Sequence, residues 1–408
     1  FAASVFHQNR QFNSLNLVDI FRCSAEVDKH PHQLLFTVPT EATTYANQLL
    51  GEAKFTNNGP LIAIQAGASQ GKRQWAPARF VQLITRLVNN YNARVVMVGT
   101  KKELSIIEPI KAGCNSDNVF VAAGRTNIPQ LAALLKESDL LVTGDTGTMH
   151  VSVAVGTPVV SMFLASAYGF ETGPYSEGNL VLQPVIGCGP CNPNKPCLGL
   201  ECHDLIDPEA LADLSIARVN EDFRTLPADL VKRFDPNKII VYRSTFDEHG
   251  FCNLLPITDP SADSLRSYRD AYRTLWMSEL CGIVEPEKIA KAKSVLSVVS
   301  DTSTGLDSLV KGAEEGKRLI TQLETLITDR FASPKALGDV NERLNQLDRD
   351  LEEIGFHQPA LGPVARMFLF AKENLLGSDP LQLASQMSRA YEDLARRGRI
   401  LGRLIQAN

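Results

Sequence analysis

The sequence predicts an α/β fold with a Rossmann-like parallel sheet, followed by a mainly helical C-terminal region. From residue 61 onward, short apolar segments alternate with amphipathic segments of helical spacing. Continuous apolar strands joined by helices are typical of a parallel sheet that is covered on both faces. Beyond residue 261, apolar residues recur every three or four positions, which is typical of packed helices. The expected strands cover residues 61–65, 93–98, 119–122, 140–143, 158–163 and 180–182.

Changes in composition divide the 408 residues into four segments. A polar break at Thr56–Pro60 separates residues 1–55 from the sheet domain, which we expect over residues 56–210. Residues 211–260 are expected to form a connector with a small hairpin. Residues 261–408 are expected to form a helical bundle or a set of docked helices.

Composition and charge exclude several classes of protein. A net charge of −5 and a pI near 5.9 argue against a nucleic-acid-binding surface. No apolar run approaches the ~20 residues that a membrane-spanning helix needs. The distribution of the eight cysteines is not that of a secreted disulfide framework. We therefore expect a cytoplasmic protein, with peripheral association at the inner face of a membrane as a further expectation. The chain opens at Phe1 without a methionine, and we expect it to be a fragment that lacks an N-terminal part.

The segment Gly144–His150 is the strongest functional signal. It follows the apolar run 140–143 and precedes a helical segment. A strand, a Gly-Asp-Thr-Gly turn and a helix together direct backbone N–H groups and the positive helix end at a phosphate. An ordinary turn capped by Asp145 or Thr146 is the alternative.

Three further turns follow predicted strands and so lie at the same edge of the sheet, where ligands bind in such folds. They are Gly67–Ser69, Gly99–Thr100 and Gly124–Thr126, and each joins a glycine to a hydroxyl residue. This combination suits close approach of the backbone to an anionic ligand.

Residues 61–210 resemble the C-terminal, donor-binding domain of glycosyltransferase family 9, the heptosyltransferases of lipopolysaccharide core assembly. Residues 1–55 resemble the end of that family's N-terminal, acceptor-side domain. The motifs occur in the family's order: Gly67–Ser69, Lys72–Trp75 with Phe80, Val96–Gly99 with Glu103, Gly124–Thr126 with Leu131–Leu135, Gly144–His150 and Ala154–Pro158.

The resemblance implies the C-terminal half of a GT-B fold, in which two Rossmann-like domains face each other. It implies transfer of a heptose-like sugar from a nucleoside-diphosphate sugar to a hydroxyl of a glycan or glycolipid, without a required cofactor. The base of this reaction is expected in the N-terminal domain, so its residue is unknown here. Two alternatives remain open: a related sugar-nucleotide epimerase, and a non-catalytic nucleotide-sugar- or partner-binding protein that uses the helical region.

The resemblance also assigns residues to the donor and its diphosphate. Which of Lys72 and Arg73 reaches the phosphate stays open. Phe163 stands where the base and ribose pocket is expected, and the sequence after it departs from the family pattern, which leaves the donor's identity open. The assigned residues are Ser69, Lys72, Arg73, Gly124, Thr126, Asp145, Thr146, Gly147 and His150, with Glu103, Arg125 and Phe163 as further candidates.

Four cysteines fall within fifteen residues: Cys188, Cys191, Cys197 and Cys202. Four thiols in a segment rich in glycine and proline could surround one structural zinc ion. Free reduced thiols, a disulfide and an iron–sulfur cluster are the alternatives. No catalytic role is expected, because the cysteines follow the donor-binding turns.

Overall fold

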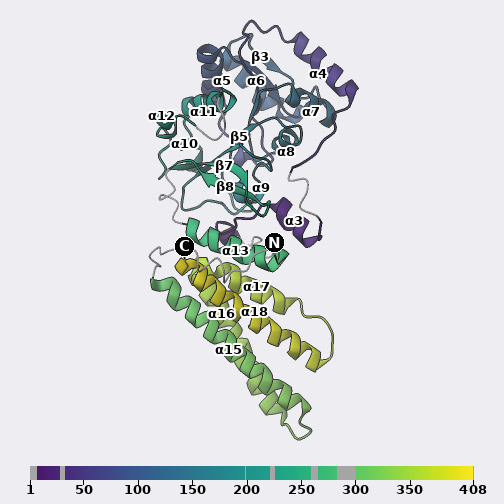
Figure 1. Cartoon of the computed structure of the whole chain (residues 1–408), viewed down its shortest axis with the longest axis vertical. Coiled ribbons are helices and arrows are strands. Elements are labelled where there is room, and N and C mark those ends of the chain that lie inside the picture. The colour runs from purple at the N-terminus through teal and green to yellow at the C-terminus, as the bar shows by residue number, and fades with distance from the viewer. Residues whose placement is uncertain are drawn as a thin grey trace. The chain divides into compact units, whose positions relative to one another are not determined.

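The computed structural model describes residues 7–27, 33–197, 199–220, 226–258, 265–282 and 300–407. It divides the chain into two compact units (Figure 1). One unit comprises residues 15–263 and contains the sheet. The other comprises residues 1–14 and 264–408 and is helical in its described part.

The first unit is built on a sheet of eight strands in the order β3-β2-β1-β4-β5-β6-β7-β8. Strands β1 to β6 are parallel, and β7 and β8 complete the sheet as an antiparallel hairpin. The first six follow the Rossmann order, so the α/β prediction is confirmed. The strands are β1 (Leu61–Gln65), β2 (Arg94–Val98), β3 (Val119–Val121), β4 (Leu140–Gly144), β5 (Val159–Met162), β6 (Leu180–Pro184), β7 (Ile239–Phe246) and β8 (Cys252–Pro256).

Helices cover both faces of this sheet. Alternate residues of β1 point to opposite faces: Ile62 and Ile64 pack with α5, α6 and α11, while Leu61 and Ala63 pack with α4, α7 and α8. The helices and 3₁₀ turns of this unit are α3 (Leu17–Ser24), α4 (Thr40–Glu52), η1 (Gly71–Arg73), α5 (Pro77–Tyr91), η2 (Lys101–Glu103), α6 (Leu104–Cys114), α7 (Ile128–Lys136), α8 (Gly147–Ala154), α9 (Gly169–Thr172), α10 (Glu201–Asp204), α11 (Pro208–Asn220) and α12 (Ala228–Val231).

The sheet unit extends beyond residues 56–210 on both sides. The hairpin of β7 and β8 lies in the segment expected as a connector, and it pairs directly with β6. On the other side, α4 contributes the buried residues Ala42, Ala46 and Leu49 to the core beneath the sheet. Both flanking segments therefore share a hydrophobic core with the parallel strands.

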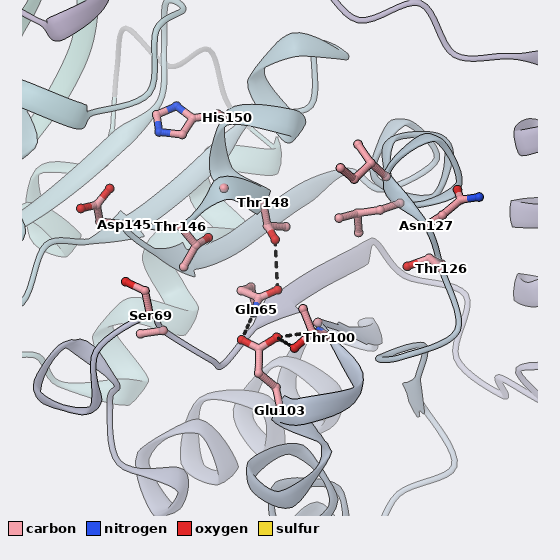
Figure 2. A pocket seen from close by; sticks show the side chains of 15 residues that line it. Gln65, Ser69, Thr100, Glu103, Thr126, Asn127, Asp145, Thr146, Thr148 and His150 are labelled. Carbon is pink, nitrogen blue, oxygen red and sulfur yellow. Dashed lines mark hydrogen bonds between the residues drawn. The ribbon is translucent and has the colours of Figure 1, made fainter.

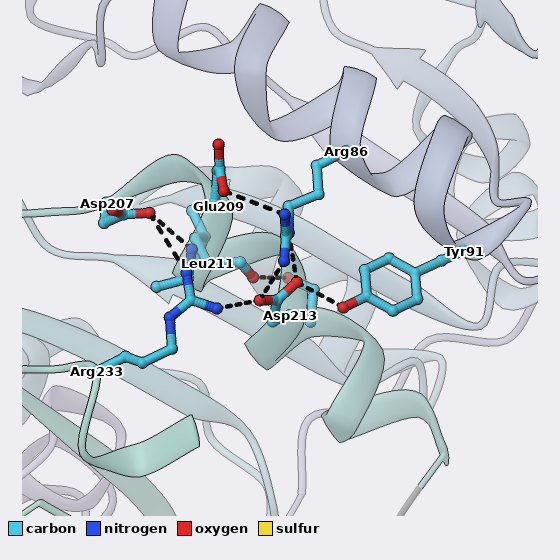
Figure 3. Close-up of polar contacts among 9 residues, drawn as sticks. Arg86, Tyr91, Asp207, Glu209, Leu211, Asp213 and Arg233 are labelled. Carbon is cyan, nitrogen blue, oxygen red and sulfur yellow. Dashed lines mark hydrogen bonds and ion pairs between the residues drawn. The ribbon is translucent and has the colours of Figure 1, made fainter. Parts of the chain in front are cut away.

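An ion cluster around Asp213 joins α11 to α5 (Figure 3). The Arg86 guanidinium donates two hydrogen bonds to the Asp213 carboxylate, with N–O distances of 2.6 and 2.9 Å. The Tyr91 hydroxyl donates a third at 2.6 Å, and Arg233 donates a fourth. Burial alone would raise the pKa of Asp213, but the hydrogen bonds from these three side chains outweigh burial and lower it. The cluster therefore stabilises the outer layer of helices through a charged carboxylate.

The second unit consists of long helices around a separate apolar core. Helices α15 and α18 pack closely, and Gly316 admits the Tyr391 ring, since a Cβ at this glycine would lie 2.2 Å from Tyr391 Cε1. The Tyr391 hydroxyl donates to Asp348 at 2.6 Å. The described elements of this second unit are α2 (His7–Arg10), α13 (Arg266–Cys281), α15 (Ser300–Thr328), α16 (Pro334–His357), η4 (Pro359–Leu361), α17 (Gly362–Glu373) and α18 (Pro380–Ala407).

Candidate functional site

A cavity of about 480 Å³ lies at the carboxyl edge of the sheet, where the strand order reverses between β1 and β4 (Figure 2). Parallel register brings the ends of the neighbouring strands to this edge, for example by pairing Gln65 with Val98. A cavity of this volume is typical of small-molecule sites, which span roughly 300–1,000 Å³. Its lining residues are Gln65, Ala68, Ser69, Gly99, Thr100, Glu103, Thr126, Asn127, Ile128, Leu131, Asp145, Thr146, Gly147, Thr148 and His150.

The start of α8 forms one wall of the cavity. Thr146 precedes the helix with extended backbone angles, and its side chain makes no capping hydrogen bond. Instead, the Thr146 and Thr143 hydroxyls lie 3.0 Å apart. The first-turn N–H groups of α8 thus have no side-chain cap at the cavity wall, and the positive helix end favours an anion there.

Asp145 stands at this wall in an ion pair with Arg73. Arg73 Nη1 lies 3.1 Å from Asp145 Oδ2, and Arg73 Nε donates to the Ser166 hydroxyl at 2.8 Å. Arg73 itself is not among the cavity-lining residues. Arg73 therefore offsets the negative charge of Asp145 without lining the cavity itself.

His150 lies one turn into α8 and reaches the cavity. Burial lowers the pKa of His150 below its usual 6.5, although the negative charge of Asp145 opposes this effect. The imidazole is consequently neutral at pH 7. It can donate one hydrogen bond without a charge, and it can gain a proton when an anion binds beside it.

The opposite part of the cavity is organised by Glu103. One carboxylate oxygen accepts a hydrogen bond from Gln65 Nε2 at 2.8 Å. The other accepts from the backbone N–H and the hydroxyl of Thr100 at 2.6 and 2.8 Å. Gln65 Oε1 in turn accepts from the Thr148 hydroxyl at 3.1 Å, so Gln65 connects the β2 turn to the first turn of α8 (Figure 2).

Gly67 makes room for this arrangement. A Cβ at Gly67 would lie 1.6 Å from Glu103 Oε1. Only a residue without a side chain allows the carboxylate to lie against the turn after β1. The Gly67–Ser69 turn therefore makes room for the Glu103 carboxylate at Gly67 and lines the cavity with Ser69.

The structure brings together part of the predicted set and separates the rest. Ser69, Thr126, Asp145, Thr146, Gly147, His150 and Glu103 line the cavity, whereas Lys72, Arg73, Gly124, Arg125 and Phe163 do not.

The residues outside the lining have other contacts. Lys72 Nζ donates to backbone carbonyl oxygens of Asn192, Pro193 and Lys195. Phe163 is fully buried in the core. The roles of these residues toward a donor stay predictions.

Two of the remaining residues shape a neighbouring turn. Gly124 has a φ of +73°, and its peptide N–H donates to the Gly99 carbonyl at 2.9 Å. Arg125 pairs with Glu52 of α4, and its carbonyl accepts from Tyr45 of the same helix at 2.7 Å. Both hold the turn that presents Thr126.

Sequence reasoning missed Gln65, Thr148 and Asn127, which also line the cavity. Gln65 carried a signal that could have been used. It is the polar last residue of an otherwise apolar strand, and only 4% of it is exposed. A buried amide at a strand end needs partners, and it finds them in Glu103 and Thr148.

The four clustered cysteines all carry free thiols. Across the described parts of the chain, no three His, Cys, Asp or Glu side chains are arranged to hold a metal ion. The zinc site stays a prediction. None of the described helices is long and apolar enough to cross a membrane.

Comparison with known proteins agrees with this geometry. Residues 15–199 match the model of glycosyltransferase family 9 (heptosyltransferase). This segment is a glycosyltransferase family 9 domain. The match includes the cavity, η1 and the first six strands, and with the observed strand order it supports a Rossmann-like half of a GT-B fold.

Curated relatives are heptosyltransferases. The chain is 29% identical over 118 residues to lipopolysaccharide core heptosyltransferase OpsX of Haemophilus influenzae, which is 28% of this chain and 33% of that protein. It is 26% identical over 182 residues to lipopolysaccharide heptosyltransferase 2 of Salmonella typhimurium, 44% of this chain and 50% of that protein. The chain thus spans a third to half of the relatives it matches.

Two solved structures are among those that resemble parts of the chain. The E. coli ADP-heptose lps heptosyltransferase II is 22% identical, with a TM-score of 0.37 over 45% of this chain and 53% of that one. A family 9 glycosyl transferase from Veillonella parvula is 24% identical, with a TM-score of 0.35 over 37% and 42% of the two chains.

Proposed function

We propose that this chain binds a nucleoside-diphosphate sugar in the cavity and acts as the donor side of a glycosyltransferase. The sugar is heptose-like, and the acceptor is a hydroxyl of a glycan or glycolipid. The observation that carries the proposal is the uncapped start of α8 beside Asp145 and His150, inside a cavity of a family 9 domain.

The chemistry of transfer requires stabilisation of the departing diphosphate. The backbone N–H groups of Thr146 and Gly147, at the start of α8, supply fixed positive dipoles, and Arg73 offsets the charge of Asp145 nearby. Hydrogen bonds from a preformed helix end need no metal ion. We therefore propose that donor binding requires no cofactor.

Neither carboxylate of the cavity is placed to act as the base. Both Glu103 oxygens already accept hydrogen bonds, from Gln65 and Thr100, and Asp145 is paired with Arg73. These carboxylates position groups instead. We infer that the acceptor-activating base is supplied by the acceptor-side domain, in keeping with the expectation from the family resemblance.

The helical unit supports a second candidate. Most of its residues lie beyond the family match, which ends at residue 199. A non-catalytic protein could bind a nucleotide sugar in the cavity and a partner through these helices. Transfer of sugar to a glycolipid acceptor by the full-length protein distinguishes the two, because the second candidate binds donor without turnover.

Isothermal titration of the full chain with ADP, UDP and GDP sugars tests donor binding. We expect saturable binding of one of them. We expect at least tenfold weaker binding by Asp145→Ala, equivalent to about 1.4 kcal/mol, because this variant loses the Asp145–Arg73 pair that fixes the turn before α8. Asp117→Ala is the matched control, because Asp117 is exposed in the same unit and outside the cavity lining. Absence of binding to all three donors would contradict both candidates.

A further inference from the structure

A second cavity lies in the helical unit, between α16 and α17, with Asn9 of α2 beside them. Its volume is about 250 Å³. The two long helices pack against each other, and α2 contacts α17. All residues that line this cavity lie outside residues 15–199, the range of the family match. A ligand bound here would therefore be separate from the sugar donor.

Two glycines bring the three helices close together at this cavity. A Cβ at Gly355 of α16 would lie 2.6 Å from the Ala365 Cβ of α17. A Cβ at Gly362 would lie 2.3 Å from Asn9 Oδ1. Side chains at these two positions would collide with their neighbours. The glycines thus allow the Asn9 carboxamide to lie directly against the first residue of α17.

The Asn9 carboxamide oxygen is buried without a partner. Asn9 is only 4% exposed, and no described residue donates a hydrogen bond to its Oδ1. Such an oxygen is rare in folded proteins, because it has lost its hydrogen bonds to water without a replacement. The terminal torsion of asparagine is broad, so rotation about it turns the oxygen from Gly362 toward the cavity. A ligand that brings a hydrogen-bond donor to Asn9 recovers the missing bond.

The other lining residues determine the character of the ligand. Phe356, Ala365 and Leu369 supply apolar surface. The charged residues of the lining are Arg366 and Glu352, and Arg366 Nη1 lies 3.5 Å from Glu352 Oε1, so their charges offset each other. A charged ligand would leave water for a wall without net charge, which is unfavourable. The cavity therefore favours a neutral ligand with an apolar body.

We propose that this cavity binds a neutral aromatic molecule that carries one hydroxyl group, the chemistry of a phenol. The hydroxyl donates to Asn9 Oδ1, and because a hydroxyl also accepts hydrogen bonds it is compatible with Arg366 on the same lining. The ring packs against Phe356, Ala365 and Leu369. An apolar cavity of roughly 150 Å³ binds benzene, so about 250 Å³ leaves room for a substituted ring. The proposal does not depend on the donor function.

Fluorine NMR titration of the full chain tests the site with two probes, 4-fluorophenol and fluorobenzene. The probes differ only in the hydroxyl group. We expect 4-fluorophenol to bind at least ten times more tightly than fluorobenzene, because only the phenol donates a hydrogen bond to Asn9. Equal affinities of the two probes would overturn the proposal. Absence of binding by both would also overturn it and would show that the cavity holds only water.

Asn9→Leu removes the carboxamide with little change in side-chain size. We expect the preference for 4-fluorophenol to fall below threefold. The urea midpoint of unfolding should stay constant or rise, because the lost oxygen had no partner. Gln358→Met is the matched control, since Gln358 Oε1 is likewise buried without a partner among the described residues but lies outside the cavity lining. Retention of the preference in Asn9→Leu, or its loss in Gln358→Met, would contradict the role of Asn9.

A second variant decides the matter if Asn9→Leu does not fold. Leu369 is partly buried on the cavity lining, and Leu369→Trp places a larger ring there. We expect this variant to bind both probes at least tenfold more weakly than the unaltered chain. Unchanged binding would show that the probes bind elsewhere.

Competition identifies the source of the phenol group, and a crystal locates it. Displacement of 4-fluorophenol by p-cresol alone assigns a free phenol. Displacement by N-acetyl-tyrosinamide as well assigns a site that also accepts the tyrosine side chain of a peptide. Displacement by neither would overturn the proposal. In a crystal soaked with 4-bromophenol, we expect bromine between α16 and α17 and the hydroxyl within hydrogen-bond distance of Asn9, and bromine only at other places would contradict the site.

Discussion

Arg73 Nη1 lies 3.1 Å from Asp145 Oδ2, and the two side chains are only 20% and 11% exposed. The pair joins η1 to the turn before α8, so one residue of the Lys72–Arg73 doublet supports the cavity wall. The Nζ of its neighbour Lys72 instead donates to the carbonyl oxygens of Asn192, Pro193 and Lys195. Two adjacent cations thus have different tasks.

Substituting Arg73 and Lys72 one at a time distinguishes their two roles. We expect Arg73→Gln to weaken donor binding at least tenfold, because Asp145 then repels the diphosphate. Lys72→Met is expected to reduce affinity less than threefold but to lower the free energy of unfolding by about 1–3 kcal/mol, since three carbonyls lose a charged donor. Calorimetric titration and urea unfolding measure the two effects, and the reverse ranking would contradict the assignment.

Gly67→Ala tests the packing of Glu103. The added Cβ would lie 1.6 Å from Glu103 Oε1, so the carboxylate must leave its hydrogen bond with Gln65. We expect a loss of about 1–3 kcal/mol in the free energy of unfolding and weaker donor binding. Gly71→Ala is the matched control, because a Cβ there meets nothing within 4 Å. Equal stability of the two variants would show that Glu103 does not depend on Gly67.

Proton uptake on donor binding tests His150. Because burial lowers its pKa below 6.5, the imidazole is neutral in the empty cavity near pH 7. An adjacent diphosphate raises this pKa, so binding near pH 6 should take up a fraction of a proton. Titrations in buffers of different ionisation enthalpy measure the uptake. We expect His150→Gln to abolish the proton uptake. The control His249→Gln, in the turn between β7 and β8, should retain it. Equal uptake by the unaltered chain and both variants would exclude His150 as the group that gains the proton.

Asp213→Asn tests the ion cluster between α5 and α11. Hydrogen bonds from Arg86, Tyr91 and Arg233 outweigh burial and lower the pKa of Asp213 below 3.8. Its contribution to stability is therefore complete above the unfolded pKa and is lost as the pH falls through the folded pKa. At pH 7 we expect a loss of about 2–4 kcal/mol in the free energy of unfolding.

The control for this variant is Asp229→Asn, whose carboxylate is 97% exposed and pairs with Lys232 at 3.4 Å. We expect a change below about 0.5 kcal/mol for this exposed pair. The difference between Asp213→Asn and the unaltered chain should shrink as the pH falls below 3.8 toward the folded pKa. A difference that stays constant with pH would indicate lost packing rather than lost charge.

The sequence was sufficient to locate the cavity because parallel strands bring their carboxyl ends to one edge. Hence Ser69, Thr126 and Asp145, which are far apart along the chain, meet at the cavity as the turns predicted. The sequence did not predict which groups the side chains contact. The carbonyl oxygens that bind Lys72 belong to an irregular loop, and no residue pattern records where such oxygens lie.

In the helical unit, too, the sequence predicted the elements but not the contacts between them. Apolar spacing predicted α15, α16 and α18, because a buried stripe leaves a regular repeat. Packing between the helices depends on particular shapes, such as Gly316 against the Tyr391 ring, which periodicity does not encode. The sequence likewise did not predict the full extent of the sheet, since a long segment that includes α11 separates β7 from its partner β6 in the chain.

A crystal structure of the chain with the nucleoside diphosphate that it binds most tightly tests the central claim most directly. The account predicts phosphate oxygens within hydrogen-bond distance of the backbone N–H groups of Thr146 and Gly147, with Glu103 at the opposite part of the same cavity. A diphosphate bound at Lys72 and residues 192–195, or anywhere away from the start of α8, would contradict it.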